Sequence, residues 1–425
     1  MKNGYNEMKC GLLGEHLLHS FSPLIHKMLG DYDYNIYDIP EGKLEDFVKN
    51  GTLDAFNVTI PYKKAVMPML DEISDEACAI GAVNVVVRKN GKLCGYNTDY
   101  FGFAYMVDSA KVDVRGKKAV LFGNGGAAAT IRKVLADKKV GELVIIDKDD
   151  NTPENIALHS DASVIINATP VGTFPNNGKA VTDLSLFPNC EAVLDIVYNP
   201  ARTALILDAK KRGITAVGGL SMLVAQAARG FELFTGDSYE DGIIEKIIDR
   251  ISRDTQNIIL VGMPSSGKST IGALLANSLE RPLLDADEEF ESMHSISPAN
   301  AIKTLGEPKF RDMEEITVAS LGKLSGKIIA TGGGAITREN NYPSLHQNGV
   351  IVYIKRDINK LSTEGRPLSQ ANPLAELYEK RKAFYERFAD ITVENNGTPE
   401  ETAKNIENAL KSFNYTCIYP SKKEL

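Results

Sequence analysis

Short apolar runs alternate with longer amphipathic segments along most of this chain. Between residues 119 and 217, the runs with the length and residue types of buried strands are Ala119–Phe122, Leu143–Ile146, Val164–Ile166, Val193–Asp195 and Ile214–Val217. A second series consists of Ile258–Val261, Ile328–Ala330 and Val350–Ile354. Strands that alternate with helices form parallel sheets, because each crossover helix returns the chain to the same edge of the sheet. The sequence therefore predicts an α/β protein with two units in tandem.

The net charge and the cysteines of the sequence limit which binding partners, disulfides and metal sites we expect. The formal net charge of the 425 residues is −8 and no run of lysine or arginine stands out, so small molecules are expected partners and nucleic acid and membranes are not. The five cysteines are scattered without a CxxC pair, which favours a reducing compartment over disulfides or structural zinc. No apolar stretch approaches the ~18 residues of a membrane span, and the first residues lack the apolar core of a signal peptide. We expect a cytoplasmic protein whose oligomeric state stays open.

Residues 262–269 read Gly-Met-Pro-Ser-Ser-Gly-Lys-Ser and match the pattern GxxxxGK[ST]. They stand between the apolar run Ile258–Val261 and the helical stretch Ile271–Leu279, which is the context that a phosphate-binding loop requires. In such a loop, backbone N–H groups surround phosphate oxygens, Lys268 reaches the transferred phosphate and Ser269 can bind Mg²⁺. The residues predicted to bind the nucleotide are Gly262, Ser265, Ser266, Gly267, Ser269 and Thr270.

Charged residues after this loop narrow the chemistry, since hydrolases and motor proteins also carry phosphate-binding loops. The run Leu283–Asp287 places Asp285 and Asp287 two residues apart, where one carboxylate can serve a metal ion and the other can face an acceptor hydroxyl. Taken alone, this pair is also consistent with an exposed acidic turn. The further motifs of this stretch are GEPKFRDME at 306–314, GGG at 332–334, RPL at 366–368 and a Tyr/Arg-rich helix that contains Arg381.

In this order, the motifs resemble those of shikimate kinase over the stretch from about Ile258 to Ala409. The residues that the resemblance implies for shikimate binding are Asp287, Arg311, Gly333 or Gly334, and Arg381. The two arginines would pair with the carboxylate of shikimate in a fork geometry. Two segments depart from the family pattern: Pro264-Ser265 stands where glycine is usual, and the shortened Asp357–Gly365 lacks candidates for stacking on adenine.

The same resemblance implies roles in phosphoryl transfer from ATP. Asp287 would orient or deprotonate the attacking hydroxyl of shikimate. Lys268 and the lid residue Arg366 would stabilise charge on the γ-phosphoryl group. Mg²⁺ is expected near Ser269, with Asp285 reaching it through water.

Short polar side chains follow apolar residues at several points of the first 100 residues. The residues in such positions include Ser20, Ser22, Thr59, Lys63, Asn84 and Asp99. Hydroxyls, amides, one ammonium and one carboxylate suit a small polyhydroxylated ligand. Three of these residues also have a purely structural explanation: Ser22 stands where a helix N-cap precedes Pro23, Lys63 is consistent with a surface lysine, and Asp99 could cap the helix that begins at Tyr100.

The segment Gly123–Ala127 follows the predicted strand Ala119–Phe122 and opens a helix. This is the setting of a dinucleotide-binding loop, although the spacing is not a strict GxGxxG. Asp147 stands about two dozen residues further on, where an acid usually contacts the ribose 2′-OH of NAD, whereas Lys148 could meet the 2′-phosphate of NADP. The predicted cofactor-binding residues are Gly123, Gly125, Gly126, Ala127, Asp147, Lys148, Thr169, Gly219 and Met222.

These motifs resemble shikimate dehydrogenase across roughly Met8 to Thr235. The substrate contacts that the resemblance implies are Ser20, Ser22, Thr59, Asn84, Asp99, Tyr198 and Gln226. It also implies that Lys63 and Asp99 form the acid–base pair and that the cofactor is NADP, with NAD as the open alternative. Reducing a ketone to an alcohol needs a proton on oxygen, which an ammonium beside the carbonyl can donate while it stabilises the developing alkoxide. The stretch Asn151–Asp161 is short for the usual crossover helix.

The two resemblances fit one another, because the first reaction makes shikimate from 3-dehydroshikimate and the second phosphorylates it to shikimate 3-phosphate. We therefore predict a bifunctional enzyme with a substrate-binding α/β lobe over residues 1–100, a Rossmann-like cofactor lobe with returning C-terminal helices over 101–251, and a kinase domain with a phosphate-binding loop over 257–425. The boundary lies in the polar stretch Ser252–Gln256. Two alternatives stay open: an NAD-dependent quinate/shikimate dehydrogenase fused to the kinase, and an active kinase with a non-catalytic shikimate-binding module.

Overall fold

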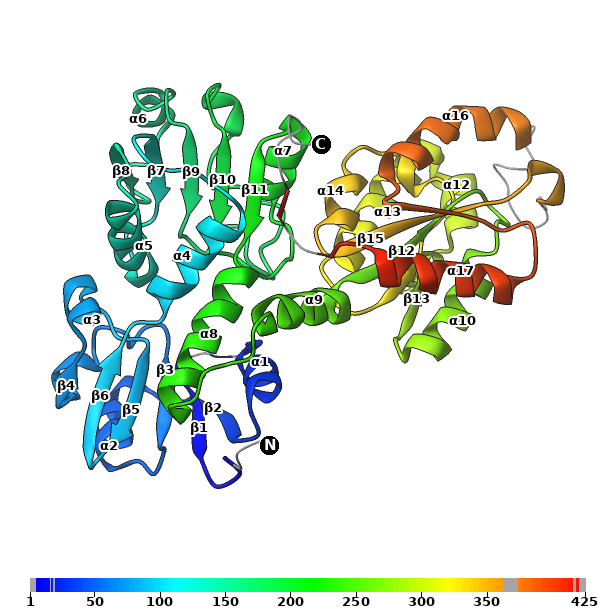
Figure 1. Cartoon of the computed structure of the whole chain (residues 1–425). Helices are drawn as coiled ribbons and strands as arrows, with labels where there is room; N and C mark the ends of the chain where they lie inside the picture. Colours follow the sequence, from blue (N-terminus) through cyan, green and yellow to red (C-terminus); the bar gives the residue numbers. More distant parts are fainter. Residues whose placement is uncertain (1–4, 16, 18–19, 362–373, 416–417, 420–425) are drawn as a thin grey trace.

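The computed structural model describes residues 5–15, 17, 20–361, 374–415 and 418–419. In this part of the chain, the strands form three sheets, each accompanied by helices (Figure 1). The mixed α/β architecture with largely parallel sheets confirms the predicted fold class. None of the helices in these ranges is both long and apolar enough to cross a membrane.

The first sheet has the strand order β2-β1-β3-β5-β6-β4. Its strands are β1 (Lys9–Gly14), β2 (Asp33–Asp38), β3 (Ala55–Val58), β4 (Glu72–Ile73), β5 (Val85–Lys89) and β6 (Lys92–Tyr96). The helices of this first lobe are α1 (Ser22–Leu29), α2 (Leu44–Asn50) and α3 (Asp75–Ile80). Strands β1, β2 and β3 are parallel, whereas β5 runs antiparallel to β3 and β6. The carboxyl ends of β1 and β3 therefore meet at one edge, where the segments with Ser20 and Thr59 begin.

The second sheet has the order β17-β11-β10-β9-β7-β8. Its strands are β7 (Lys118–Phe122), β8 (Glu142–Ile146), β9 (Val164–Asn167), β10 (Ala192–Asp195), β11 (Thr215–Gly218) and β17 (Ile418–Tyr419). The helices of this second lobe are α4 (Asp99–Ser109), α5 (Gly126–Asp137), α6 (Pro153–Ala157), α7 (Ala204–Arg212), α8 (Leu220–Thr235) and α9 (Ile243–Thr255). Strands β7 to β11 are parallel and β17 is antiparallel to β11. The short crossover after β8 contains only the five-residue helix α6.

The third sheet has five parallel strands in the order β13-β14-β12-β15-β16. Its strands are β12 (Asn257–Val261), β13 (Leu283–Asp285), β14 (Ile328–Ala330), β15 (Gly349–Lys355) and β16 (Ile391–Glu394). Its helices are α10 (Lys268–Leu279), α11 (Ala286–His294), α12 (Pro298–Leu305), α13 (Glu307–Gly322), α14 (Asn341–His346), α16 (Leu374–Phe388) and α17 (Pro399–Ser412). Strand β12 is central and buried along its whole length, which explains its nearly continuous apolar sequence.

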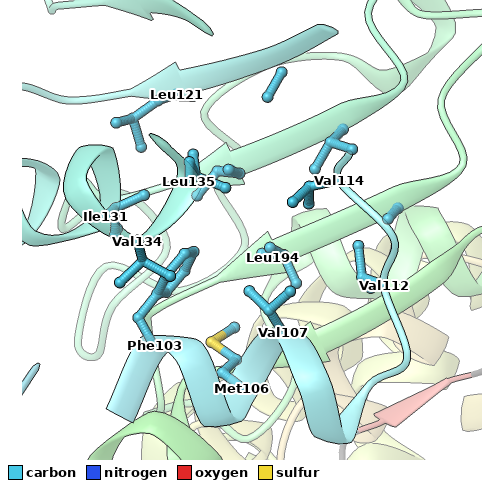
Figure 2. Packing of buried hydrophobic residues seen from close by; sticks show 14 of the residues in the cluster. Phe103, Met106, Val107, Val112, Val114, Leu121, Ile131, Val134, Leu135 and Leu194 are labelled. Carbon is cyan, nitrogen blue, oxygen red and sulfur yellow. The ribbon is translucent and has the colours of Figure 1, made fainter. Parts of the chain in front are cut away.

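Helix α4 connects the first lobe to the second and packs on the second sheet (Figure 2). Phe103 and Met106 on one side of α4 are fully buried in a cluster with Leu121 of β7 and Val134 of α5. Their spacing along α4 gives the apolar stripe of a helix that lies on a sheet. This packing fixes the start of α4, where Asp99 stands.

Helix α4 also lies very close to α8, and a glycine permits this approach. A Cβ atom at Gly102 would lie 2.6 Å from the carbonyl oxygen of Met222 and 3.0 Å from the Cβ of Gln226. Because α4 begins with Asp99 and α8 carries Gln226, the approach of the two helices sets the distance between two predicted substrate residues.

Gly102→Ala should force these helices apart. We expect a loss of about 1–3 kcal/mol in the free energy of unfolding of the first two lobes, as for other overpacked sites. Urea and thermal unfolding followed by circular dichroism would measure it. Gly42→Ala is the matched control, because a Cβ there meets nothing within 4 Å; equal midpoints for the two variants would contradict the prediction.

Candidate active sites

The first candidate site is built around an ion pair between the first two lobes. Lys63 Nζ lies 2.6 Å from Asp99 Oδ2, and the two side chains are only 18 % and 8 % exposed. Lys63 stands in the turn after β3, where its carbonyl accepts a hydrogen bond from Val83 N. The Cδ of Lys63 lies 3.8 Å from the position of a Cβ at Gly126, so the pair faces the glycine loop of the second lobe. Lys63 is therefore a largely buried, ion-paired residue and not an exposed surface lysine.

A buried row of amides and hydroxyls adjoins this pair. Asn84 Oδ1 accepts a hydrogen bond from Thr98 N at 2.6 Å, and Asn84 Nδ2 donates to Thr98 Oγ1 at 3.1 Å. Thr98 Oγ1 in turn donates to Gln226 Oε1 of α8 at 3.3 Å. Thr98, and not Asp99, is the N-cap residue of α4, which leaves the carboxylate of Asp99 to Lys63. The structure thus brings four predicted residues, Lys63, Asn84, Asp99 and Gln226, to one place.

A second group of predicted residues lies at the start of α1. The backbone N–H of Ser22 donates to Ser20 Oγ at 3.2 Å, and the ring of Phe21 between them lies 5.4 Å from the ring of Tyr198. Phe21 packs in the same apolar cluster as Leu223 of α8, whose carbonyl accepts from Gln226 Nε2. Helix α1 begins at Ser22 and its N-cap is Phe21 without a side-chain cap bond, so helix capping, the structural alternative for Ser22, does not apply.

The glycine loop occupies the point where three strands of the second sheet end. Gly123 has φ +103, and a Cβ there would lie 3.0 Å from Thr169 Cγ2. Its N–H donates to the carbonyl of Ile146 at the end of β8. At Gly125 a Cβ would meet nothing within 4 Å, and at Gly126 only Lys63, so the backbone at the start of α5 is accessible. An accessible helix N-terminus with glycines fits the phosphates of a dinucleotide.

The remaining predicted cofactor residues differ in their surroundings. Asp147 and Lys148 are exposed, and Asp147 Oδ1 accepts from the backbone N–H of Lys148 at 2.7 Å. Thr169 Oγ1 donates to Asn167 Oδ1 at 2.6 Å. Gly219 lies so close to the carbonyl of Ile196 that a side chain would not fit there. The remaining two are Ala127 in the first turn of α5 and Met222, which is buried in α8.

A buried carboxylate that the sequence did not indicate holds this edge of the sheet together. Asp195 at the end of β10 is fully buried and accepts from Asn167 Nδ2 at 2.9 Å, Val197 N at 3.1 Å and Thr203 Oγ1 at 2.6 Å. Burial raises the pKa of Asp195 to about 6, and the three donors oppose that rise. Asp195 therefore ties β9, through Asn167, to the loop that carries Tyr198.

The second candidate site begins at the phosphate-binding loop. Gly262 and Gly267 have φ +154 and +95, and Ser265 adopts φ +62, a conformation that favours glycine. Position 265 thus has a backbone conformation that suits glycine, although this chain carries serine there and departs from the family pattern. Lys268 Nζ donates to the carbonyls of Gly262 and Met263 at 3.0 Å each, so it lies inside the curve of the loop. The other predicted loop residues are Ser266, which is buried, and Ser269 and Thr270, which are exposed.

The acidic pair follows β13 directly. Ser269 Oγ donates to Asp285 Oδ2 at 2.8 Å, and Asp285 Oδ1 accepts from the backbone N–H of Asp287 at 3.0 Å as the N-cap of α11. A hydroxyl beside a carboxylate provides hard oxygen ligands, which fit Mg²⁺. Ser269 and Asp285 therefore form the candidate metal site that was predicted.

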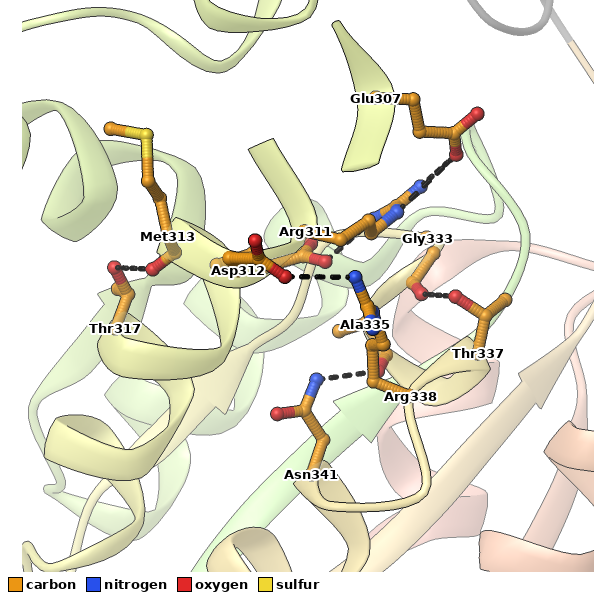
Figure 3. Close-up of polar contacts among 12 residues, drawn as sticks. Glu307, Arg311, Asp312, Met313, Thr317, Gly333, Ala335, Thr337, Arg338 and Asn341 are labelled. Carbon is orange, nitrogen blue, oxygen red and sulfur yellow. Dashed lines mark hydrogen bonds and ion pairs between the residues drawn. The ribbon is translucent and has the colours of Figure 1, made fainter. Parts of the chain in front are cut away.

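Two buried arginines converge on the triple glycine. Arg311 Nη1 donates to Glu314 Oε2 at 2.6 Å, and its Nη2 donates to Glu307 Oε1 at 3.1 Å (Figure 3). Arg381 Nη1 donates to the carbonyl of Gly333 at 3.1 Å. A Cβ at Gly334 would collide with the guanidinium of Arg311. The turn thus holds both guanidinium groups close together.

Two carboxylates complete this group. A Cβ at Gly332 would lie 2.9 Å from Glu314 Oε1 and 3.3 Å from Asp287 Oδ1. Burial raises the pKa of Glu314, and the neighbouring Arg311 opposes that rise. The site therefore presents two cations and the carboxylate of Asp287 around a glycine turn, which suits an acid that also carries hydroxyl groups. Arg366 lies outside the described residues.

Residues 12–86 match the family described as the shikimate dehydrogenase substrate-binding domain, and residues 264–411 match shikimate kinase. A shikimate dehydrogenase (NADP(+)) of Clostridium perfringens is 37% identical over 264 residues, which cover 57% of this chain and 97% of the relative.

The chain belongs to the shikimate dehydrogenase family.

Solved structures agree with this assignment of the first two lobes. A chorismate mutase/shikimate 5-dehydrogenase fusion protein from Clostridium acetobutylicum superposes with a TM-score of 0.54 at 32% identity, covering 57% of this chain and 97% of that one. Shikimate 5-dehydrogenase of Thermus thermophilus, in complex with NADP(H) and shikimate, gives a TM-score of 0.52 at 28% identity and covers 56% and 98%. The chain thus joins a shikimate dehydrogenase to a shikimate kinase domain, as predicted.

Sequence reasoning overlooked several residues of these sites. Thr98 of the dehydrogenase part directly precedes the predicted Asp99, so its position was a usable signal. Glu314 belongs to the GExxFRxxE motif of the kinase part. Tyr385, whose hydroxyl donates to the carbonyl of Gly333 at 2.5 Å, lies one helical turn after Arg381. Asp195 gave no such signal, because an acid at the end of a strand is common.

Gly334→Ala should displace the guanidinium of Arg311 in the kinase domain. We expect the KM of the kinase for shikimate to rise about tenfold or more, because a charge-assisted, two-pronged contact to a carboxylate depends on position. The KM for ATP should stay within about twofold, since the phosphate-binding loop is untouched. Steady-state kinetics with each substrate varied in turn would test this. An equal loss for both substrates would indicate general damage to the domain instead.

Proposed function

We propose that this chain catalyses two consecutive reactions, the NADP-dependent reduction of 3-dehydroshikimate to shikimate and the ATP- and Mg²⁺-dependent phosphorylation of shikimate to shikimate 3-phosphate. The observation that carries the first activity is the Lys63–Asp99 pair, which faces the glycine loop at Gly126. The second rests on the approach of Arg311 and Arg381 to one glycine turn beside the phosphate-binding loop. The proposed partners of this chain are therefore small molecules.

In the dehydrogenase site, Lys63 is the proposed acid. Bound NADPH supplies the hydride. The ammonium of Lys63 stabilises the developing alkoxide and donates the proton to its oxygen. Asp99, 2.6 Å away, orients the ammonium and balances its charge. Asn84 and Gln226 beside this pair provide amide groups for the hydroxyls of the substrate.

The other predicted residues line the same substrate in this proposal. Ser20, Ser22, Thr59 and Tyr198 belong to segments that start at the carboxyl ends of parallel strands, where ligands of α/β sheets bind. Tyr198 provides an apolar ring with a hydroxyl at its tip, which suits a cyclic polyol acid. Burial raises the pKa of this hydroxyl, so it stays protonated as a donor.

In the kinase site, binding and positioning carry most of the catalysis. Arg311 and Arg381 hold the carboxylate of shikimate, and Asp287 orients or deprotonates the attacking hydroxyl. Lys268 stabilises charge on the transferred phosphoryl group. Ser269 would bind Mg²⁺ directly, and Asp285 would bind it through water.

We also infer a cytoplasmic location from the cysteines. The four cysteines among the described residues are free thiols, and burial raises the pKa of Cys10 and Cys190 to about 12. Unreactive, unpaired thiols are typical of a reducing compartment. Cell fractionation followed by immunoblotting would test this location.

Lys63→Ala and Lys268→Ala should separate the two activities. Lys63→Ala should lower kcat of the dehydrogenase by about 10²–10⁴-fold, the usual contribution of acid–base catalysis, and leave the kinase within about twofold. Lys268→Ala should do the reverse. Reduction of NADP⁺ with shikimate and consumption of ATP with shikimate, assayed separately, would show it. The exposed neighbour Lys64→Ala is the control for Lys63.

Three outcomes of these assays would overturn parts of the proposal. Loss of both activities from either substitution would contradict independent sites. Absence of NADP⁺ and NAD⁺ reduction in the unchanged protein, with an active kinase, would make the first part a binding module. Faster turnover of quinate with NAD⁺ than of shikimate with NADP⁺ would favour the quinate/shikimate alternative.

Lys148 is the residue expected to favour NADP over NAD. Its ammonium is exposed after β8, beyond the glycine loop, where it can meet the 2′-phosphate. Lys148→Ala should raise KM for NADP⁺ about tenfold and leave KM for NAD⁺ within about twofold, because only NADP⁺ carries that phosphate. Parallel measurements of nicotinamide reduction with each cofactor would decide this. Unchanged KM for NADP⁺ would show that another group binds the phosphate.

A further inference from the structure

One buried arginine connects the dehydrogenase to the kinase domain. Arg202, in the loop between β10 and α7, is only 2 % exposed. Its Nη1 donates to the carbonyls of His346 at 2.7 Å and Gly349 at 3.1 Å, and its Nη2 donates to Gln256 Oε1 at 2.7 Å. Its backbone N–H donates to the carbonyl of Gln347 at 2.8 Å. The segment 346–349, which we call the docking turn, belongs to the kinase domain and joins α14 to β15.

Two side chains of the docking turn extend this contact. Asn348 Oδ1 accepts from the backbone N–H of Ala201 at 2.8 Å, and Gln347 Oε1 accepts from Asn177 Nδ2 at 2.8 Å. Side-chain and backbone groups on both sides are thus paired at fixed positions. Such buried, directional contacts hold a loop more firmly than exposed ion pairs do.

Charges around the docking turn suit a buried guanidinium. His346 Nε2 lies 2.9 Å from Asp390 Oδ1, and the carboxylate of Asp390 also accepts from Ile351 N. Burial, together with the charge of Arg202, lowers the pKa of His346 to about 4, so this imidazole is neutral at pH 7. Asp390 therefore supplies a negative charge near Arg202 that the imidazole does not neutralise. The negative charge of Asp390 therefore complements the positive charge of Arg202.

The C-terminal end of the chain adds a second connection. Strand β17 leaves the kinase domain and pairs antiparallel with β11, with Val217 opposite Ile418 and Ala216 opposite Tyr419 (Figure 1). Strand β11 is the neighbour of β10, whose last residue is Asp195. The dehydrogenase is thus contacted both at the loop that follows β10, by the docking turn, and at β11, by β17.

This loop carries the predicted substrate residue Tyr198 between two anchors. Asp195 accepts from Val197 N before Tyr198 and from Thr203 Oγ1 after it. Between Tyr198 and Thr203, Arg202 is held by the docking turn. A small pocket that Tyr198 lines is also lined by Ser325 and Asn348 of the kinase domain. The segment that carries Tyr198 therefore lies next to the kinase domain.

We propose that the kinase domain is a structural part of the dehydrogenase substrate site, with Arg202 as the positioning residue through which the docking turn sets the place of Tyr198. This inference rests on the proposed function, because it assigns Tyr198 to shikimate binding. Arg202 itself is enclosed by the docking turn and acts on the substrate only through Tyr198. Its effect passes along the backbone of a loop whose ends are tied to Asp195 and whose residue Arg202 is held by the docking turn.

The test is made from the kinase side, in the full chain. Asn348→Ala removes the acceptor of Ala201 N from the docking turn. We expect the KM of the dehydrogenase for shikimate to rise severalfold, with kcat and the KM for NADP⁺ within about twofold, because only substrate positioning is affected. The assay omits ATP, so that the kinase does not consume shikimate. Asn340→Ala, at an exposed asparagine of the same domain, is the matched control.

A second pair of variants, both at Arg202, separates the loss of its hydrogen bonds from a general loss of folding. Arg202→Met removes the donors and keeps an apolar stem, and Arg202→Lys keeps the charge and part of the donors. The KM for shikimate should rise about tenfold or more in Arg202→Met and be partly restored in Arg202→Lys, while kinase kinetics stay unchanged.

Two results would overturn the inference. One is an unchanged KM for shikimate in both Asn348→Ala and Arg202→Met. The other is a parallel loss of kcat and of affinity for shikimate and NADP⁺, which would indicate general unfolding of the lobe. Absence of dehydrogenase turnover in the unchanged protein would refute the proposed function instead, so the two failures are distinguishable.

Discussion

The buried carboxylate of Asp195 holds together the edge of the second sheet from which the loop with Tyr198 and Arg202 begins. A buried carboxylate must find donors, and those that Asp195 finds stand on segments that the chain brings to the end of β10. Asn167 links it to Thr169 on the cofactor side, and Thr203 links it to the loop of Tyr198. Because all these bonds share one carboxylate, the edge proposed to bind the cofactor and the loop proposed to contact the substrate cannot move independently. The two halves of the dehydrogenase site are fixed to one another here.

Glycines permit close approach in both candidate sites, because a neighbouring helix or side chain lies where a Cβ atom would otherwise be. At Gly102 the absent side chain lets two helices approach, and these helices carry Asp99 and Gln226. At Gly334 it makes room for the guanidinium of Arg311. The first glycine acts through packing and the second through direct contact with a binding group. At both positions, the geometry of the site depends on the absence of a side chain at the glycine.

The fold and much of the candidate sites were predictable because their signals are local or repeated. Continuous apolar runs marked β7 to β11, and the phosphate-binding loop has a spacing that few other structures share. The pairing of Lys63 with Asp99, 36 residues apart, came only from resemblance. For Ser22 the sequence context also fits an N-cap, and the structure removes only this structural alternative. Strand β17 has two residues and no periodicity, so nothing in the sequence marked it.

Arg202 shows why docking between domains escapes sequence reasoning. Two of its partners are main-chain carbonyls 144 and 147 residues away, and every residue type has such a carbonyl, so the sequence does not indicate these contacts. The same fact determines what removal of the kinase domain would do. The guanidinium would return to water, where it is well solvated, so the sheets of the dehydrogenase need not unfold. The loop would keep its bonds to Asp195 and would lose the contacts that hold Arg202 between Tyr198 and Thr203. A tyrosine proposed to bind substrate depends on order in its loop more than on the stability of the whole fold. Fusion thus matters to the dehydrogenase through geometry, even where each domain keeps its own core.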